Sequence, residues 1–276
     1  VLVAVGSLLL GLCMVLFPAL LQPFVRQITG SDDFAIGHFG SLGYFVSGTI
    51  GKYAGNKEHS TEHIQVPKQL GFLRDTSVAV SLTMTLLFVV VAIFAGPGFV
   101  ESELSGGSNY IVFSIIQAIT FAAGVYIVLA GVRMLIAEIV PAFKGIADKM
   151  VPNAKPALDC PTVFPFAPNA VIIGFLVSFA AGLISMFFLP LFGLAIIVPG
   201  LVPHFFTGAT AGVFGNATGG RRGAILGAFA NGLLISFLPA MLLPLLGNLG
   251  FESTTFGDSD FALVGILISW FVSLFT

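Results

Sequence analysis

The stretch Thr76–Ala95 reads TSVAVSLTMTLLFVVVAIFA, twenty residues without a charged side chain. A helix of this length rises about 30 Å, which matches the hydrocarbon core of a bilayer. The rest of the chain has the same character, because 57% of its 276 residues are hydrophobic and only 9% are Asp, Glu, Lys or Arg. Soluble domains carry about 25% charged residues. We therefore predict an all-α polytopic membrane protein.

Apolar runs of similar length recur along the chain. Five are predicted to cross the membrane: Val1–Val25, Thr76–Ala95, Tyr110–Val132, Ala170–Leu189 and Gly223–Leu246. A sixth run, Phe261–Thr276, is shorter, and a seventh, Leu191–Phe206, is interrupted by two prolines. Both ends of the chain fall inside apolar runs, so we expect residues 1–276 to form one membrane-embedded region of a longer protein.

The basic residues predict which side of the membrane each polar segment faces. All except Arg26 lie in three segments, 52–74, 133–155 and 221–222, whereas segments 101–103 and 252–260 carry only acidic charges. The positive-inside rule places the three basic segments in the cytoplasm. Between segments 133–155 and 221–222 an even number of crossings is then needed, and we expect Ala170–Leu189 and Leu191–Phe206 to provide it. Residues 52–75 and 133–157 are predicted to be cytoplasmic amphipathic connectors, lying on the membrane surface or docking a soluble partner.

Two segments cannot form ordinary membrane-spanning helices. In Ser31–Gly51, Gly37, Gly40, Gly43 and Gly48 weaken a helix, and Asp159–Ala170 contains three prolines that forbid a continuous one. Irregular backbone inside a membrane is tolerated where it is buried in protein or lines a cavity. Segments 31–51 and 159–170 are therefore predicted to be re-entrant or broken segments that form a substrate site. A third glycine-rich segment, Thr207–Gly220, is predicted to allow close helix packing.

Polar groups stand inside both broken segments: His38 in the first, and Asp159 and Asn169 in the second. An ionisable group is costly to bury in a membrane, so each is a candidate for substrate contact. His38 could instead be a core histidine bonded to a neighbouring carbonyl group. For Asp159, which is the stronger candidate, the alternative is a helix cap at the membrane interface.

Several kinds of chemistry find no support in the sequence. There is no GxxxxGK[ST] loop for a nucleotide, no GxSxG elbow and no HExxH pair. Cys13 and Cys160 form no CxxC pair. His59 and His63 have the i, i+4 spacing of metal ligands, but a solvated loop explains this segment better. The net charge of −2 gives no sign of the basic surface that binds nucleic acid. We predict no cofactor and no metal, and an energy source outside this chain.

Three runs carry a family resemblance: SDDFAIGH (31–38), GVRMLIAEIVPAFKGIADKMVPNAKPALDCPTVFPFAPNAVIIGF (131–175) and IVPGLVPHFFTGATAGVFGNATGGRRGA (197–224). They resemble the membrane component, enzyme IIC, of ascorbate-type phosphoenolpyruvate-dependent phosphotransferase systems (PTS). Galactitol-type carriers are more distant relatives. The resemblance covers most of the chain and corresponds to roughly the later three-fifths of a family member.

The resemblance implies an inverted-repeat PTS IIC transporter fold with re-entrant hairpins, a V-motif domain and a core domain. Such proteins are homodimers that carry L-ascorbate across the bacterial inner membrane, and a cytosolic IIB subunit, itself supplied by IIA, phosphorylates the sugar acid from a phosphocysteine. His38 and Asp159 match the family's histidine and acid by position. Phe39 stands where the ascorbate carriers have a glutamine, which leaves the exact substrate open. Cys160 would not carry the phosphoryl group, since that cysteine belongs to the partner.

We therefore expect a PTS permease for L-ascorbate or a related sugar acid or polyol, with a substrate-binding set of His38, Phe39, Asp159, Cys160 and Asn169. One alternative is a secondary transporter coupled to H⁺ or Na⁺, with Asp159 as the protonatable group. Another is a membrane-embedded enzyme, which would need a cluster of catalytic groups where the sequence offers only isolated ones.

Overall fold

The computed structural model describes residues 2–64, 76–247 and 254–274. Within them, five helices are long and apolar enough to cross a membrane: Val3–Thr29, Ser77–Ala95, Tyr110–Met150, Pro168–Phe192 and Leu201–Leu245. A shorter apolar helix, α10 (Ser259–Ser273), follows. The prediction of an all-α polytopic membrane protein is confirmed.

The chain forms two compact units. The smaller, Ile64–Leu135, is a helical hairpin in which α3 (Thr76–Ala95) packs against α5 (Tyr110–Met134). The connection contains the short α4 (Pro97–Phe99) and a π-turn (Val100–Leu104). Apolar side chains point outward from both helices, and Phe94 is 87% exposed. Such a surface is suited to lipid rather than water.

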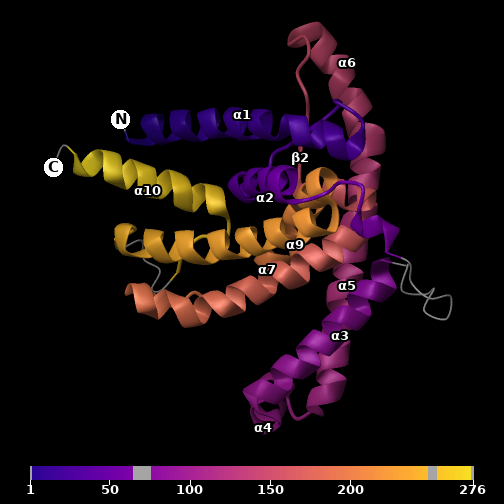
Figure 1. Ribbon diagram of the computed structural model, residues 1–276, viewed down its shortest axis with the longest axis vertical. Coiled ribbons are helices and arrows are strands. Elements are labelled where there is room, and N and C mark those ends of the chain that lie inside the picture. The colour runs from indigo at the N-terminus through magenta and orange to yellow at the C-terminus, as the bar shows by residue number, and fades with distance from the viewer. Residues whose placement is uncertain (1, 65–75, 248–253, 275–276) are drawn as a thin grey trace. The chain divides into compact units, whose positions relative to one another are not determined.

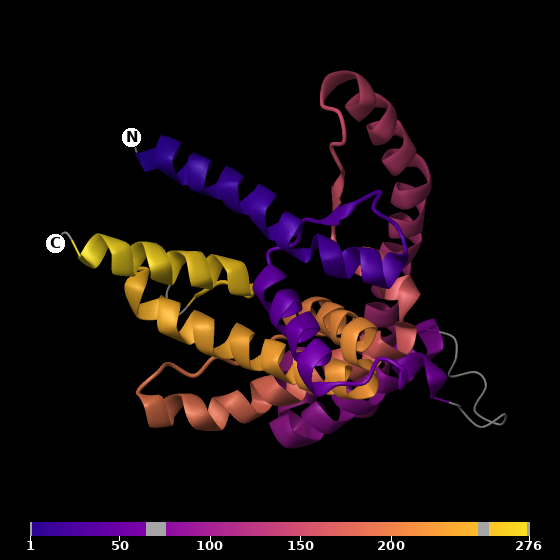
Figure 2. The same cartoon turned by 45° about the horizontal axis from the view of Figure 1, so that its top comes forward.

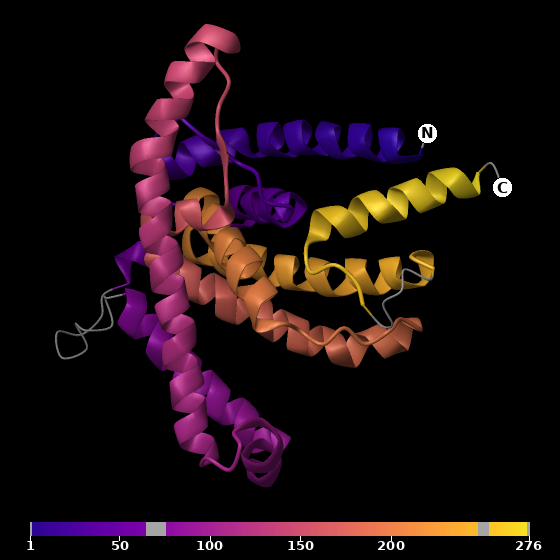
Figure 3. The same cartoon turned by 180° about the vertical axis from the view of Figure 1, so that it is seen from behind.

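The larger unit combines Val1–His63 with Ile136–Thr276. Its long helices are α1 (Leu2–Thr29), α7 (Pro168–Phe188) and α9 (Ala209–Leu242). In Figures 1 and 3, α7 and α10 lie on opposite sides of α9. Shorter helical turns complete the unit: η1 (Thr61–His63), η4 (Leu135–Ile139), η6 (Leu189–Phe192), α8 (Leu201–Pro203), η7 (His204–Gly208) and η8 (Leu243–Leu245). Through η4 the helical conformation of α5 continues into α6 (Val140–Met150), which lies within the predicted connector 133–157.

Helix α9 is two helices joined by a reversal at Gly220. The side-chain amide of Asn231 donates to Thr207 Oγ1 at 3.1 Å, although 24 residues of straight helix would separate these residues by about 36 Å. Gly220 has φ 59° and ψ −148°, a conformation open to glycine and strained for other residues. A Cβ there would also lie 2.3 Å from the Asn56 carbonyl oxygen.

The reversal corrects the predicted path of the seventh apolar run. We expected Leu191–Phe206 to cross the membrane, but residues 193–200 have no regular structure and the helix begins at Leu201. Pro199 at the end of this stretch disfavours helical backbone in the residue before it. The arm that leads to Arg221 is thus 201–219, and the arm that leaves it is 221–242, so an even number of passes is kept.

Helix α2 (Ser41–Ala54) packs against both arms of α9 and crosses α9 in Figure 2. The contact is made by small residues at four-residue spacing: Gly43, Ser47 and Gly51 in α2, and Gly215, Gly219, Gly223 and Gly227 in α9. A Cβ on Gly219 would lie 2.3 Å from the Gly51 carbonyl oxygen. Ser47 Oγ donates to the Ala211 carbonyl oxygen at 2.5 Å. Small residues allow this close backbone approach.

Glycines were expected to weaken residues 31–51 as a helix, yet the second half of this segment is helical. Helix α2 forms there because its glycines are contact surfaces. With 14 residues it rises about 21 Å, which is too short to span a bilayer. The connector predicted over 52–75 is described only to residue 64, where it contains the end of α2 and η1; its remainder lies outside the described residues.

Candidate functional site

A two-residue parallel β-bridge joins the first broken segment to the residues directly before the second. β1 (Ala35–Ile36) pairs with β2 (Ala157–Leu158), with Ala35 opposite Ala157. The backbone N–H of Ala35 donates to Pro156 at 2.9 Å, and that of Gly37 donates to Leu158 at 2.8 Å. The bridge brings the residue after β1, His38, close to the residues after β2, Asp159 and Cys160.

Ion pairs around Asp32 fix the entry to this bridge. Arg26 Nε, at the end of α1, lies 2.6 Å from Asp32 Oδ1, and Lys155, just before β2, pairs with the other carboxylate oxygen. Gln22 Nε2 donates to Asp32 Oδ1 at 2.6 Å. Hydrogen bonds from Arg26, Lys155 and Gln22 hold the pKa of the Asp32 carboxyl well below its usual range. The charged form therefore persists at all physiological pH values, and it ties α1 to the first broken segment and to Lys155 before β2.

The ring of His38 is oriented by its own turn. Nδ1 accepts a hydrogen bond from the backbone N–H of Gly40 at 3.1 Å and lies 2.7 Å from the hydroxyl oxygen of Tyr44. Because a backbone N–H can only donate, Nδ1 serves as an acceptor, and the neutral tautomer carries its proton on Nε2. Nε2 is 3.9 Å from Asp258 Oδ1. His38 thus presents an N–H donor beyond its own segment.

Asp159 and Cys160 begin the 3₁₀ helix Cys160–Phe166 (η5). Asp159 Oδ1 caps this helix by accepting from the backbone N–H of Cys160 at 2.7 Å, as the capping alternative expected. Its carboxylate is nevertheless exposed, so it can accept further hydrogen bonds. Ligand atoms of His38, Asp159 and Cys160 all lie within 4.8 Å of one another.

A nitrogen, a sulfur and a carboxylate oxygen are ligand types that zinc uses. Zinc would bind Cys160 as a thiolate. The sulfur of this completely buried side chain lies 3.8 Å from the Phe206 carbonyl oxygen and is placed to donate to it. A carbonyl oxygen accepts a proton donor, which favours the thiol form. The arrangement is better suited to hydrogen bonding with the hydroxyls of a small polar molecule.

The other two predicted site residues have different surroundings. The Phe39 ring packs on Phe261 with centroids 4.4 Å apart, and Phe39 and His38 line one pocket of about 120 Å³. The Asn169 side chain donates to the Thr61 carbonyl oxygen at 3.1 Å. Glu62 accepts from the backbone N–H groups of Asn169 and Ala170 at the start of α7. Asn169 therefore belongs to a hydrogen-bonded contact that holds the start of α7 against η1.

Sequence reasoning missed two residues that shape the site. Tyr44 is completely buried and places its hydroxyl on His38; its position among apolar and glycine residues of the first broken segment was the available signal. Asp260 belongs to the acidic segment 252–260, but its side chain is 1% exposed. Its oxygens accept from the backbone N–H groups of Ser41 at 2.9 Å and Leu42 at 2.8 Å. Asp260 thus caps α2 directly after the His38 turn.

Replacing this cap is expected to destabilise the larger unit. Asp260→Ala leaves two buried N–H groups without their partner, which costs at least about 2 kcal/mol of unfolding free energy. A thermal unfolding midpoint in detergent should fall by about 4–8 °C. Asp148→Ala, at an exposed position in α6, is the matched control. Equal midpoints for the two variants would show that Asp260 does not hold α2.

Comparison with known proteins identifies the family. A family model described as "PTS system sugar-specific permease component" matches residues 1–260. The protein named "Ascorbate-specific PTS system EIIC component" of Mycoplasma pneumoniae is 31% identical over 232 residues, and the match covers 73% of this chain and 34% of that relative. The chain therefore spans about a third of the length of the curated relative it matches. With a match along nearly its whole length and helices suited to repeated membrane crossing, the chain belongs to the family of PTS sugar-specific permease (EIIC) components.

Proposed function

We propose that this chain translocates L-ascorbate, or a related sugar acid or polyol, across the bacterial inner membrane by alternating access. The observation that carries the proposal is the convergence of His38 with Asp159 and Cys160 through the β-bridge. The His38 Nε2–H would donate to a substrate oxygen, and the exposed Asp159 carboxylate would accept from a substrate hydroxyl. The 31% identical relative is named as ascorbate-specific, which supports the substrate class.

The remaining predicted residues would have supporting roles. Phe39 would form an apolar wall of the pocket beside His38. The completely buried Cys160 would bound the cluster of His38, Asp159 and Cys160 on the side that faces the protein interior. Asn169 would position the second broken segment through its hydrogen bond to the Thr61 carbonyl oxygen. Small-molecule sites commonly enclose about 300–1,000 Å³, so the pocket of about 120 Å³ beside His38 would have to widen to admit a six-carbon substrate. Such widening is expected of a site that opens alternately to two sides.

Coupling to phosphorylation would account for accumulation by a chain whose sequence has no nucleotide-binding loop. We infer that a cytosolic IIB subunit, supplied by IIA, phosphorylates the substrate on the cytoplasmic side, and that the permease works as a homodimer. The phosphorylated product carries added negative charge and cannot return across the bilayer.

Membranes containing the protein are expected to phosphorylate radiolabelled ascorbate only when the cognate IIB and the upstream phosphoryl donors are present. The matched control contains IIB and the donors with membranes that lack the protein. Phosphorylation from ATP alone would contradict the proposal. Substrate uptake that continues without IIB would favour the secondary transporter, with Asp159 as the titrating group.

A further inference from the structure

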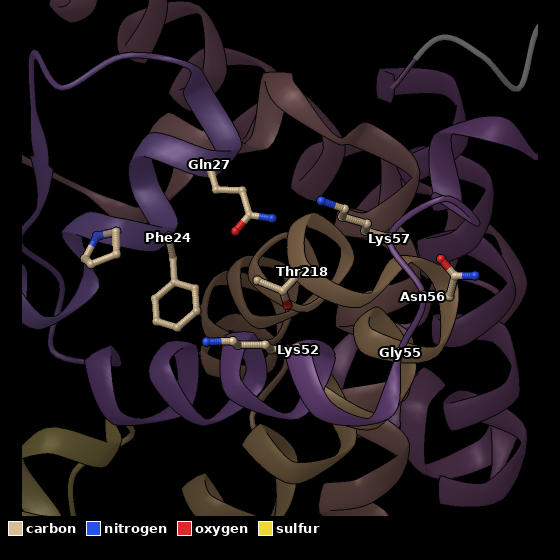
Figure 4. Close-up of a pocket in the computed structure, with 8 residues that line it drawn as sticks. Phe24, Gln27, Lys52, Gly55, Asn56, Lys57 and Thr218 are labelled. Carbon is tan, nitrogen blue, oxygen red and sulfur yellow. The ribbon is translucent and has the colours of Figure 1, made fainter.

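A second pocket, of about 680 Å³, lies beside the C-terminal ends of α1 and α2 and the tip of the α9 hairpin (Figure 4). Its volume falls in the range of small-molecule sites. It shares no lining residue with the pocket around His38. Its side-chain lining includes Phe24, Gln27, Lys52, Asn56, Lys57 and Thr218.

Hydrogen bonds between distant segments hold the walls of this pocket. Gln27 Nε2 on α1 donates to the Ala217 carbonyl oxygen at 2.7 Å. Thr218 Oγ1 donates to Gly48 at 2.8 Å, and the backbone N–H of Asn56 donates to Gly219 at 2.9 Å. Three helix ends are thereby fixed around one hollow, so the pocket is formed before any ligand enters it.

The described lining of the pocket is positively charged. Its lining contains two lysines and no Asp or Glu. Within the described part of the chain, the ion pairs involve neither Lys52 nor Lys57. The Lys52 ammonium group lies 5.9 Å from the centroid of the Tyr53 ring, a weak contact that does not neutralise the charge. In the view of Figure 4, the Lys52 side chain extends toward Phe24 and the Lys57 side chain toward Gln27.

We propose that this pocket binds a phosphate group, carried by an anionic lipid headgroup or by a soluble phosphate monoester. Two ammonium groups that form no ion pair within the described residues match the charge of a phosphate, which can accept several charge-assisted hydrogen bonds. Pro23 and Phe24 add an apolar edge from α1, a helix long enough to span the bilayer. Basic pockets between helices on the cytoplasmic side are typical of phospholipid headgroup sites. The proposal does not depend on the identity of the transported substrate.

The test uses the purified protein with two probes. Calorimetric titration with inorganic phosphate and with glycerol 3-phosphate measures the soluble source. Native mass spectrometry of protein released from mixed phosphatidylglycerol and phosphatidylcholine bilayers measures which lipid stays bound. The variant is Lys52→Gln/Lys57→Gln, and the control is Arg133→Gln/Lys149→Gln, which removes the same charge at exposed positions that do not line the pocket.

One probe is expected to bind the unmodified protein and the control, and to bind the pocket variant at least about tenfold more weakly for each lysine lost. Affinity should also fall as NaCl is raised, because exposed charges are screened. Loss of phosphate-ester binding assigns the soluble source, and loss of phosphatidylglycerol retention assigns the lipid. Binding of neither probe, or equal binding by the pocket variant and the control, would overturn the proposal. Both lysines are exposed, so unchanged elution and melting of the variant will show that it is folded.

Discussion

His38→Ala and Asp159→Asn are each expected to weaken substrate binding by about 5- to 150-fold while the protein still folds. In the proposed site, each substitution leaves a substrate polar group without its partner, which costs about 1–3 kcal/mol, and each 1.4 kcal/mol is a factor of ten in affinity. The Asp159→Asn change keeps an oxygen that can accept from the Cys160 N–H, so the cap of η5 survives. Its effect should therefore appear in binding rather than in stability.

The measurement is substrate affinity and the yield of monodisperse protein on the same preparations. His63→Ala and Asp148→Asn are matched controls, because both side chains are exposed and neither belongs to the His38 cluster. A third variant, Tyr44→Phe, removes the hydroxyl that lies on His38 Nδ1 but keeps the ring that packs on Phe214. Its affinity should fall less than that of His38→Ala, since Gly40 still orients the imidazole. Normal affinity in both His38→Ala and Asp159→Asn would remove these residues from the site.

Gly219→Val is expected to disrupt the larger unit. A Cβ at this position would lie 2.3 Å from the Gly51 carbonyl oxygen and 2.6 Å from Gly51 Cα. Backbone atoms cannot rotate away as a side chain can, so the packing of α2 against α9 must open. Overpacking costs typically about 1–3 kcal/mol and more where the contact is backbone. The thermal unfolding midpoint should fall by at least about 6 °C, and the folded yield should fall with it.

Gly124→Val is the control for this experiment, because no atom within 4 Å would meet a Cβ on Gly124. Gly219→Ala should give an intermediate loss, since it adds one methyl group in place of three carbons. If Gly219→Val melted like Gly124→Val, α2 and α9 would not be in the close contact described here.

Much of the architecture follows from local features of the sequence. The membrane-spanning helices were predictable because an uncharged run of about 20 residues has few alternatives to a spanning helix in lipid. The break at Asp159–Ala170 was predictable because proline removes a backbone donor and clashes with the preceding turn. The resemblance to PTS permease components was carried by long runs that include both broken segments. His38 and Asp159 were candidates because buried ionisable groups in a membrane are costly and seldom incidental.

Other features depend on residues that are distant in the sequence, and only the tertiary structure decides them. Helix α2 forms despite its glycines because the α9 glycines lie against them, a contact that local propensity cannot register. Asp260 lies about 220 residues after the helix that it caps, so no spacing rule could connect the two. The β-bridge joins Ala35 to Ala157 and places His38 beside Asp159. Sequence periodicity predicts the secondary structure of each segment by itself. The site forms only when segments far apart in the sequence pack together, and no local pattern indicates which segments will do so.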